Sequence, residues 1–584
     1  MIDDTKKSYL RMEGNKLNDP LIGPKKYWSI INKFLNRKKI PMIPPILHGG
    51  NFITDPQAKV NIFNEFFAGQ YTPFVNDSQL PDIRYRTNKS LENITIRKER
   101  ILEIISCLNP SKSHRCDNIS IKMIQKNQIV LPLMIIFETC LKAGVYPELW
   151  KMSNVCPVHK KRIKKFSQKL SSSKIFGKVI FESLYGYIME NKLLSVCQSG
   201  FQKGDSCVSQ LIKITHDIFK SLDSNQMIGT RSIFLDMSKA FDKVWHEGLL
   251  YKLRSHGVQG KLFDLFANYL KDRKQRTVIS GQHSEWRQVT AGVPQGSVLG
   301  PLLFLLYVND LPDNLLCNPK LFADDVSLNE HVHDSTLSSE RLTHDLREIE
   351  HWAFKWKMVF NPDPNKPANE VTFTNQANVD TPNLFYTGNL IQSVSHHKHL
   401  GLSLDNKLNF NQHIKEKIAK ANTGIYAIRK LFDYLPRKTL LHIYKAFVRP
   451  YLDYCDVIYH RPCRDSLAQD SFKMIQNPNL TFTEKVESVQ YNAALAITGC
   501  IRGTSKEKIY NGLGIESLYE RRNFHRLLYF YKIKHDLVPA YLKNELPQTI
   551  SSIYNTRHHV DSWINTRTTK YGNSFFPHCV TWDF

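Results

Sequence analysis

Three aspartates stand where short apolar strands are expected to end or turn. Asp236 follows the apolar run 232–235, while Asp324 and Asp325 lie within 320–328, a pattern typical of two short strands around an acidic turn. Each aspartate alone is more often a turn or cap residue. Together, carboxylates from two separate elements can hold two Mg²⁺ ions, which suits nucleotidyl transfer, where a hydroxyl, a phosphate and a leaving pyrophosphate must be aligned and their charge neutralised.

Hydrophobic periodicity predicts the elements around these aspartates. We expect a helix at 206–222 and a strand at 232–235, and farther upstream a helix at 58–67 and a helix–loop–helix unit over 101–150 in which 131–141 forms a buried face. Beyond residue 410 the pattern is helical again. Four stretches have this periodicity: 414–431, 439–448, 485–497 and 510–534. The sequence thus predicts a mixed α/β core followed by a helical, basic C-terminal third.

Longer motifs surround the three aspartates. They read FLDMSKAFDKV at 234–244, AGVPQGSVLGP at 291–301 and FADD at 322–325. In these motifs, the chain resembles the reverse transcriptases of non-LTR (LINE-type) retrotransposons, especially the jockey-like group. The resemblance extends from about Lys26 to Pro577. It implies an RNA-directed DNA polymerase in which Asp236, Asp324 and Asp325 are catalytic and bind two Mg²⁺ ions, for which Mn²⁺ can substitute.

The resemblance also implies nucleotide-binding residues. Phe241 would lie under the incoming sugar and exclude a ribose 2′-hydroxyl, although without the motif it would be read as a core aromatic. Gln295 and Gly296 would belong to a turn that packs against the nascent base pair, where glycine lets the backbone come close to nucleic acid. Lys366 would assist departure of pyrophosphate, although such a lysine is usually only solvated.

Template and primer contacts are implied at two further places. Pro294 would brace the turn beside the template. Gly401 and Leu402 lie in 399–405, which looks like the hairpin that grips the primer, and the basic helices after it would follow the duplex backbone. The resemblance therefore places the nucleic acid between the aspartates and the C-terminal helices.

The chain departs from the family pattern at three places. Arg115 replaces the glycine of a Lys-x-x-Gly-x-Asp segment, at a cost of about 1 kcal/mol if that glycine needs a positive φ. Residues 162–173 replace an Asn-Tyr-Arg-Pro-Ile-Ser block whose arginine grips the triphosphate, and their lysines lack the bidentate fork of arginine. Gln202 stands where relatives carry arginine.

The resemblance implies an α+β right-hand polymerase with fingers, palm and thumb and a helical C-terminal extension. The predicted division has four parts: an N-terminal extension (1–100), fingers and palm (101–409), a thumb (410–470) and a helical C-terminal region (471–584). No endonuclease is recognisable before Lys26, so a separate endonuclease is expected as a partner.

Composition supports a nucleic-acid partner. The formal net charge is +25, and such an excess attracts a polyanion and releases its counterions. The expected partners are an RNA template, a DNA primer and dNTPs. No apolar stretch is long enough to span a bilayer, so no membrane partner is expected. We expect a soluble, intracellular protein, in the cytoplasm and the nucleus.

Two other functional classes stay open at this point. The intact aspartates favour an active polymerase, but the lost arginine block favours a catalytically impaired relic that still folds and binds nucleic acid. A binding protein recruited from such an element would keep the same charge and fold.

Overall fold

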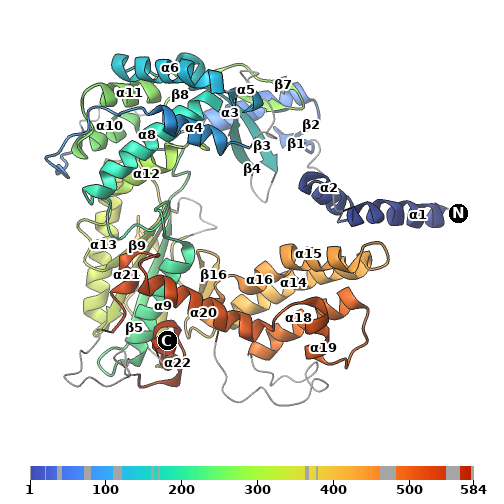
Figure 1. Cartoon of the computed structure of the whole chain (residues 1–584). Coiled ribbons are helices and arrows are strands. Elements are labelled where there is room, and N and C mark those ends of the chain that lie inside the picture. Colours follow the sequence, from blue (N-terminus) through green and yellow to red (C-terminus); the bar gives the residue numbers. More distant parts are fainter. Residues whose placement is uncertain are drawn as a thin grey trace, which may run out of the picture.

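A computed structural model describes most of the chain. The described residues are 2–19, 22–35, 43–70, 80–109, 121–125, 127–159, 163–168, 171–361, 367–376, 379–460, 482–547, 564 and 566–580. Helices and strands alternate through much of this range, which confirms the predicted mixture of α and β structure. In Figure 1 the elements form an upper group, a column along the left and a lower group.

A five-stranded sheet lies at the centre of the molecule. Its spatial order is β14 (Gln392–Ser393), β11 (Asn369–Thr374), β5 (Gly229–Asp236), β10 (Asp325–Val332) and β9 (Asn318–Phe322). All neighbours are antiparallel except β11 and β14. The predicted strand at 232–235 and the predicted hairpin at 320–328 are therefore confirmed, and both belong to this sheet.

Strand β5 separates two hydrophobic cores. Side chains alternate between the two faces of a strand, so Ile233 and Leu235 enter one core while Phe234 enters the other. Every residue of β5 is buried except the last, Asp236, which is exposed. Burial on both faces explains the continuous apolar run, and the exposed end leaves a carboxylate at the edge of the core.

The first core joins β5 to the upper helices and to α13. The elements of this part are α4 (Lys98–Ser106), α6 (Val130–Ala143), α8 (Ser171–Glu190), α10 (His246–Ser255), α11 (Gly260–Leu270), α12 (Gly300–Val308) and α13 (Ser335–Lys355). A second sheet, in the order β4 (Ile163–Gln168), β3 (Met152–His159), β6 (Arg273–Ile279) and β7 (Gln282–His283), with β8 (Arg287–Val289) beside β6, lies next to α3 (Pro56–Ala68). Helix α3 confirms the predicted helix at 58–67.

The predicted buried face at 131–141 is only partly correct. Leu133 and Phe137 of α6 are buried, but Leu131 and Ile135 are more than half exposed. Apolar residues occur on more sides of α6 than its neighbours cover. The apolar pattern therefore predicted more buried residues than the structure has.

The second core joins the other face of β5 to α9 (Cys207–Asp223) and to the C-terminal helices. These helices are α14 (Asn411–Leu431), α15 (Arg437–Phe447), α16 (Arg449–Asp453), α17 (Asp456–Tyr459), α18 (Phe482–Thr498), α19 (Lys506–Leu513), α20 (Leu518–Lys534), α21 (Ala540–Lys543), α22 (Thr569–Gly572) and α23 (Phe575–Val580). They confirm the helical C-terminal third. The helical pattern predicted over 510–534 is divided between two helices, because Gly514 takes φ +60° and caps α19 before Ser517 begins α20 with a capping box.

The N-terminal helices lie beside this helical part (Figure 1). They are α1 (Ile2–Asn15) and α2 (Pro24–Phe34). The hydroxyl of Tyr27 is 2.8 Å from Nδ1 of His442, and Trp28 meets Phe447 edge to face, which attaches α2 to α15.

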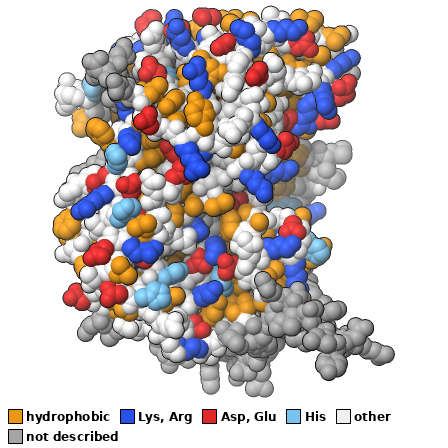
Figure 2. Space-filling model, turned by 90° about the vertical axis from the view of Figure 1, so that its left-hand side faces the viewer, with side chains coloured by type: hydrophobic (Ala, Val, Ile, Leu, Met, Phe, Trp, Pro, Cys, Tyr) orange, Lys and Arg blue, Asp and Glu red, His pale blue; other side chains and the backbone are white. Residues whose placement is uncertain are grey.

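The excess of basic residues does not form a continuous basic patch on the face of the molecule that Figure 2 shows. Figure 2 shows the left-hand side of Figure 1, where α13 lies, and there Lys and Arg side chains alternate with Asp and Glu. Among the described residues no helix is both long and apolar enough to cross a membrane.

Candidate active site

The pairing of β5 with β10 brings two of the predicted aspartates together. Asp325 is the direct antiparallel partner of Asp236, which places their Cα atoms about 4.5–5.5 Å apart. The chain reverses between β9 and β10 through the two residues Ala323 and Asp324, and the backbone N–H of Met237 donates to the carbonyl of Asp324 at 3.2 Å. All three carboxylates therefore belong to one edge of the central sheet.

The turn that carries Asp324 is held by a segment from elsewhere in the chain. Ala323 has φ +56°, a conformation that costs about 1 kcal/mol for a non-glycine residue. The side-chain oxygen of Gln198 accepts hydrogen bonds from the N–H groups of Ala323 at 2.9 Å and Gly200 at 2.8 Å. A Cβ on Gly200 would lie 2.4 Å from the Ala323 nitrogen, so only glycine fits against this turn.

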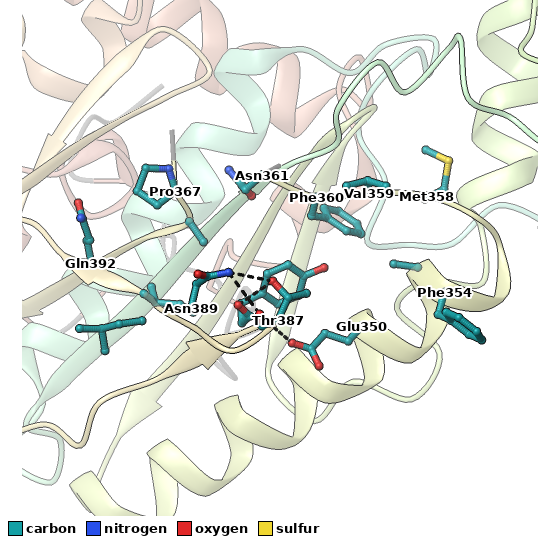
Figure 3. Close-up of a pocket in the computed structure, with 15 residues that line it drawn as sticks. Glu350, Phe354, Met358, Val359, Phe360, Asn361, Pro367, Thr387, Asn389 and Gln392 are labelled. Carbon is teal, nitrogen blue, oxygen red and sulfur yellow. Dashed lines mark hydrogen bonds between the residues drawn. The ribbon is translucent and has the colours of Figure 1, made fainter. Parts of the chain in front are cut away.

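The end of β5 is fixed by Asn361. Its side-chain oxygen accepts from the N–H of Asp236 at 3.0 Å, and its own N–H donates to the Asp236 carbonyl at 3.0 Å. A cavity of about 540 Å³ lies beside this contact, between α13 and the hairpin of β12 (Phe385–Tyr386) and β13 (Asn389–Leu390). Figure 3 shows Asn361 at one end of this cavity and Thr387 bonded to Glu350 at the other. None of the three aspartates lines it.

The electrostatics of the three aspartates suit a cation. Burial, together with the charges of Asp324 and Asp236, raises the pKa of Asp325 to about 7. Within the described residues, no three His, Cys, Asp or Glu side chains by themselves form a cluster that could hold a metal ion. Mg²⁺ does not require one, because it keeps several waters and takes substrate phosphate oxygens beside one or two carboxylates. The oxygen donors present fit such an ion.

Phe241 lies in a short aromatic stack. It is half-buried, its ring stacks on Phe304 with centroids 4.7 Å apart, and it meets Phe201 edge to face at 6.0 Å. Gly292 packs against its backbone, since a Cβ there would lie 2.8 Å from the Phe241 carbonyl. The ring is therefore positioned from two sides while part of it remains accessible.

The segment Pro294–Ser297 forms the predicted turn. The N–H of Ser297 donates to the Pro294 carbonyl at 3.1 Å, and Gly296 takes φ +73°, which a type II turn requires at its third residue. Gln295 donates to the buried carboxylate of Asp242 at 2.9 Å, and Gly296 is exposed at the tip. The motif residues 241–242 and 294–296 are thus joined in space.

Gly401 and Leu402 lie in a second hairpin, formed by β15 (His396–His399) and β16 (Leu402–Asp405). Leu400 and Gly401 both have positive φ, as a type I′ turn demands, and Leu402 is fully buried. The hydroxyl of Tyr454 donates to the Leu400 carbonyl, and its ring lies 3.2 Å from where a Cβ on Gly401 would be. The predicted hairpin is confirmed, whereas its contact with a primer stays a prediction.

Three sequence predictions fall partly or wholly beyond this description. Lys366 and the segment 112–117 lie outside the described residues. Within the replaced stretch 162–173, residues 163–168 form β4, which pairs with β3. Gln202, which stands where arginine is usual, donates from its side chain to the Gln198 carbonyl at 2.5 Å.

Sequence reasoning missed the residues that support the site. None of Gln198, Gly200, Asn361 and Tyr454 was predicted to support it. Asn361 and Asp236 are 125 positions apart, and no local pattern indicates a contact between such distant residues.

Comparisons with known proteins agree with this geometry. The family model described as reverse transcriptase (RNA-dependent DNA polymerase) matches residues 158–373. The "Probable RNA-directed DNA polymerase from transposon BS" of Drosophila melanogaster is 25% identical over 532 residues, which cover 86% of this chain and 56% of that protein. The "RNA-directed DNA polymerase from mobile element jockey" of Drosophila funebris is 29% identical over 395 residues, covering 63% of this chain and 42% of the relative. The chain thus spans about half the length of the curated relatives it matches.

The matched range contains the three aspartates, Phe241 and the Pro294–Ser297 turn. It also contains four strands of the central sheet wholly or in large part, β5, β9, β10 and β11. The chain therefore carries a reverse transcriptase domain and, over most of its length, is related to the RNA-directed DNA polymerases of non-LTR retrotransposons.

Proposed function

We propose that this chain is an RNA-directed DNA polymerase that adds deoxynucleotides to a primer 3′ end. The observation that carries the proposal is the convergence of Asp236, Asp324 and Asp325 at one edge of the central sheet. Asp236 and Asp324 are the principal ligands of two Mg²⁺ ions, with Asp325 beside them. When bound, the ions neutralise charge on the phosphates and on the attacking hydroxyl.

The raised pKa of Asp325 supports a cation at this place. Burial raises this pKa most, and the charges of Asp324 and Asp236 raise it further; a divalent ion would offset that repulsion. Gln198 binds the backbone N–H of Ala323 and Asn361 binds that of Asp236, so both side chains fix the backbone that carries the carboxylates. Such preorganisation is what a transfer reaction needs from the protein.

In this proposal the neighbouring motifs handle the substrates. The accessible part of Phe241 faces the sugar of the incoming dNTP and excludes a ribose. The exposed tip of the Pro294–Gly296 turn meets the template and the new base pair, while Lys366 assists departure of pyrophosphate. The hairpin with Gly401 and Leu402 contacts the primer.

The architecture in this proposal is a right hand. The central sheet is the palm, and the upper helices and the β3–β6 sheet are the fingers. Residues 410–470 are the thumb, and residues 471–584 are a helical C-terminal region. Helix α14 supports this assignment, since its exposed lysines at 415, 420 and 430 can follow a nucleic-acid backbone. The partners are an RNA template and a DNA primer.

Primer extension on an RNA template, with dNTPs and Mg²⁺, tests the proposal. We expect extension by the parent chain and a loss of at least about 1,000-fold in Asp236→Asn, because an amide cannot replace a charged metal ligand. Asp264→Asn serves as the matched control, since Asp264 is exposed on α11 and pairs with Lys261 in the same helix turn. We expect it to keep parent activity.

Two outcomes would overturn the proposal in different ways. Equal extension by the parent chain and Asp236→Asn would show that Asp236 takes no part in the reaction. No extension by the parent chain, combined with tight binding of an RNA–DNA duplex, would identify a nucleic-acid-binding relic. Replacing 162–173 by the Asn-Tyr-Arg-Pro-Ile-Ser block would then locate the defect.

A further inference from the structure

Helix α9 carries a polar stripe that would normally face solvent. Ser209, Lys213, His216 and Asp223 recur at helical spacing along one side, while the other sides carry apolar core residues. Yet Ser209, His216 and Asp223 are buried. The cover is the C-terminal part of the chain, as the red helices α20 and α21 against the green α9 show in Figure 1.

Residues of the C-terminal segment form ion pairs and hydrogen bonds with the polar side chains of this stripe. Glu545 pairs with Lys213 at 2.8 Å and with His216 at 3.3 Å. The carboxylate of Asp223 accepts from the backbone N–H groups of Arg567 at 2.8 Å and of Thr568 at 2.7 Å. The hydrogen bond to His216, with a further one from Lys213, lowers the pKa of Glu545 to about 2, so the Glu545 carboxylate is charged at neutral pH and pairs with Lys213.

The same segment reaches the loop before α9. The hydroxyl of Tyr541 donates to the carboxylate of Asp205, at 2.9 Å from one oxygen and 3.1 Å from the other, and lies 3.4 Å from the hydroxyl of Ser199. Tyr529 adds a hydroxyl contact to Ser209 at 2.7 Å. Tyr541 therefore binds the segment that immediately follows Gln198.

That segment is the one that holds the turn of Asp324. The N–H of Ser199 donates to the carbonyl of Leu321 in β9 at 2.8 Å, and Gln198 accepts from Ala323. Tyr541 is thus connected to the turn by its hydrogen bonds to Asp205 and Ser199, by the backbone of residues 198–205, and by the hydrogen bonds of Gln198 and Ser199.

We propose that the C-terminal region is a brace for the catalytic aspartates, and that Tyr541 is a positioning residue for the polymerase reaction. The inference rests on the proposed function for its catalytic part. In this proposal Tyr541 contacts neither metal nor substrate. Its hydroxyl holds Asp205 and Ser199 in place, and these residues hold the strand-like pairing of 197–200 with β9. Without that support Ala323 can leave its left-handed conformation, and Asp324 loses its place beside Asp236.

Tyr541→Phe in the full chain is the test, since it removes one hydroxyl and keeps the ring. Tyr531→Phe is the matched control, because Tyr531 is half exposed on α20 with its ring against His535. Amide hydrogen exchange at Ser199, Gly200 and Ala323 gives a readout that needs no activity. Primer extension at varied Mg²⁺ and dNTP gives the second readout.

For Tyr541→Phe we expect exchange at these three amides to be about tenfold faster, because one charge-assisted hydrogen bond is lost. The melting temperature should fall by no more than about 4 °C, so the chain stays folded. We expect kcat to fall by about tenfold and half-saturating Mg²⁺ to rise, while KM for dNTP stays close to the parent value. Excess Mg²⁺ should restore part of the rate. Tyr531→Phe should change none of these.

Parent-like exchange at the three amides in folded Tyr541→Phe would overturn the brace. A fall in kcat without any change in exchange or in Mg²⁺ dependence would also overturn it. If Tyr541→Phe does not fold, Asp205→Asn is used instead, which keeps an oxygen acceptor and should shift exchange in the same direction by a smaller factor. A parent chain that extends no primer would refute the proposed function alone, because the exchange experiment still decides the brace.

Discussion

Two hairpins with two-residue turns lie near each other in this molecule and are held in different ways. The β9–β10 hairpin is joined by backbone hydrogen bonds to β5 on one side and to residues 197–199 on the other. The β15–β16 hairpin forms a sheet of its own and meets the centre through side chains, with the His397 ring stacked on Phe234 at 4.2 Å and Tyr454 against its turn. The carboxylates proposed to bind a metal are fixed by backbone hydrogen bonds, whereas the hairpin proposed to follow a primer is fixed by side-chain packing.

The largest expected effect comes from disturbing the backbone contact of the first hairpin. In Gly200→Ala the new Cβ would meet the Ala323 nitrogen at 2.4 Å, so the turn must move. We expect a loss of about 3 kcal/mol in the free energy of unfolding. Primer extension should fall by about 100-fold because Asp324 is displaced.

Denaturant unfolding and primer extension measure these two effects. Gly186→Ala is the control, since nothing lies within 4 Å of its Cβ in α8, and alanine should stabilise that helix by up to about 1 kcal/mol. Unchanged extension by Gly200→Ala would mean that the turn tolerates displacement and that the comparison of the hairpins is mistaken.

A smaller effect concerns charge in the same hairpin. The pKa of Asp325 is raised to about 7 in the folded chain, so its stabilising contribution is complete below the unfolded value near 3.8 and is lost as the pH rises through about 7. In EDTA, Asp325→Asn should therefore be more stable than the parent at pH 8, by about 2 kcal/mol, and should lack this loss. Urea unfolding between pH 5 and pH 8 measures the difference, with Asp264→Asn as control. Parent stability that rises across this interval would contradict the assignment.

The smallest effect belongs to the second hairpin. Gly401→Ala forces φ +85° on alanine and brings a Cβ to 3.2 Å from the Tyr454 ring, which can give way. We expect about 1 kcal/mol of lost stability and a several-fold weaker primer–template affinity, with kcat nearly unchanged. Gly388→Ala is the control, because it has φ +75° and no atom within 4 Å, so it isolates backbone strain. A fall in kcat as large as that of Gly200→Ala would remove the distinction between the hairpins.

Elements whose pattern is local could be predicted from the sequence. Strand β5 has an apolar run ending on Asp236, and the FADD turn separates two strands, so both followed from short-range periodicity. The exposed Leu131 and Ile135 of α6 and the break at Gly514 could not be predicted, since the number of packing neighbours and the choice of a left-handed cap are decided by the tertiary structure.

Contacts between segments far apart in the chain could not be predicted from the sequence either. Tyr541 and Asp205 are 336 residues apart, and nothing in either local pattern indicates the other. The polar stripe of α9 looks like an ordinary solvated face until Glu545 and Thr568 are found on it. The three aspartates could be predicted because a motif carries them, whereas Gln198 and Asn361 support them through single contacts.

The distance along the chain between α9 and its cover has a consequence for synthesis. Asp223 finds its hydrogen-bond donors 344 residues later, so α9 leaves the ribosome long before Arg567 and Thr568 exist. Pairings this far apart are slow to form and expose unpaired surface until they do. In a nascent chain the proposed brace therefore cannot form until the segment up to Thr568 has been synthesised, and the polar side of α9 stays uncovered until then.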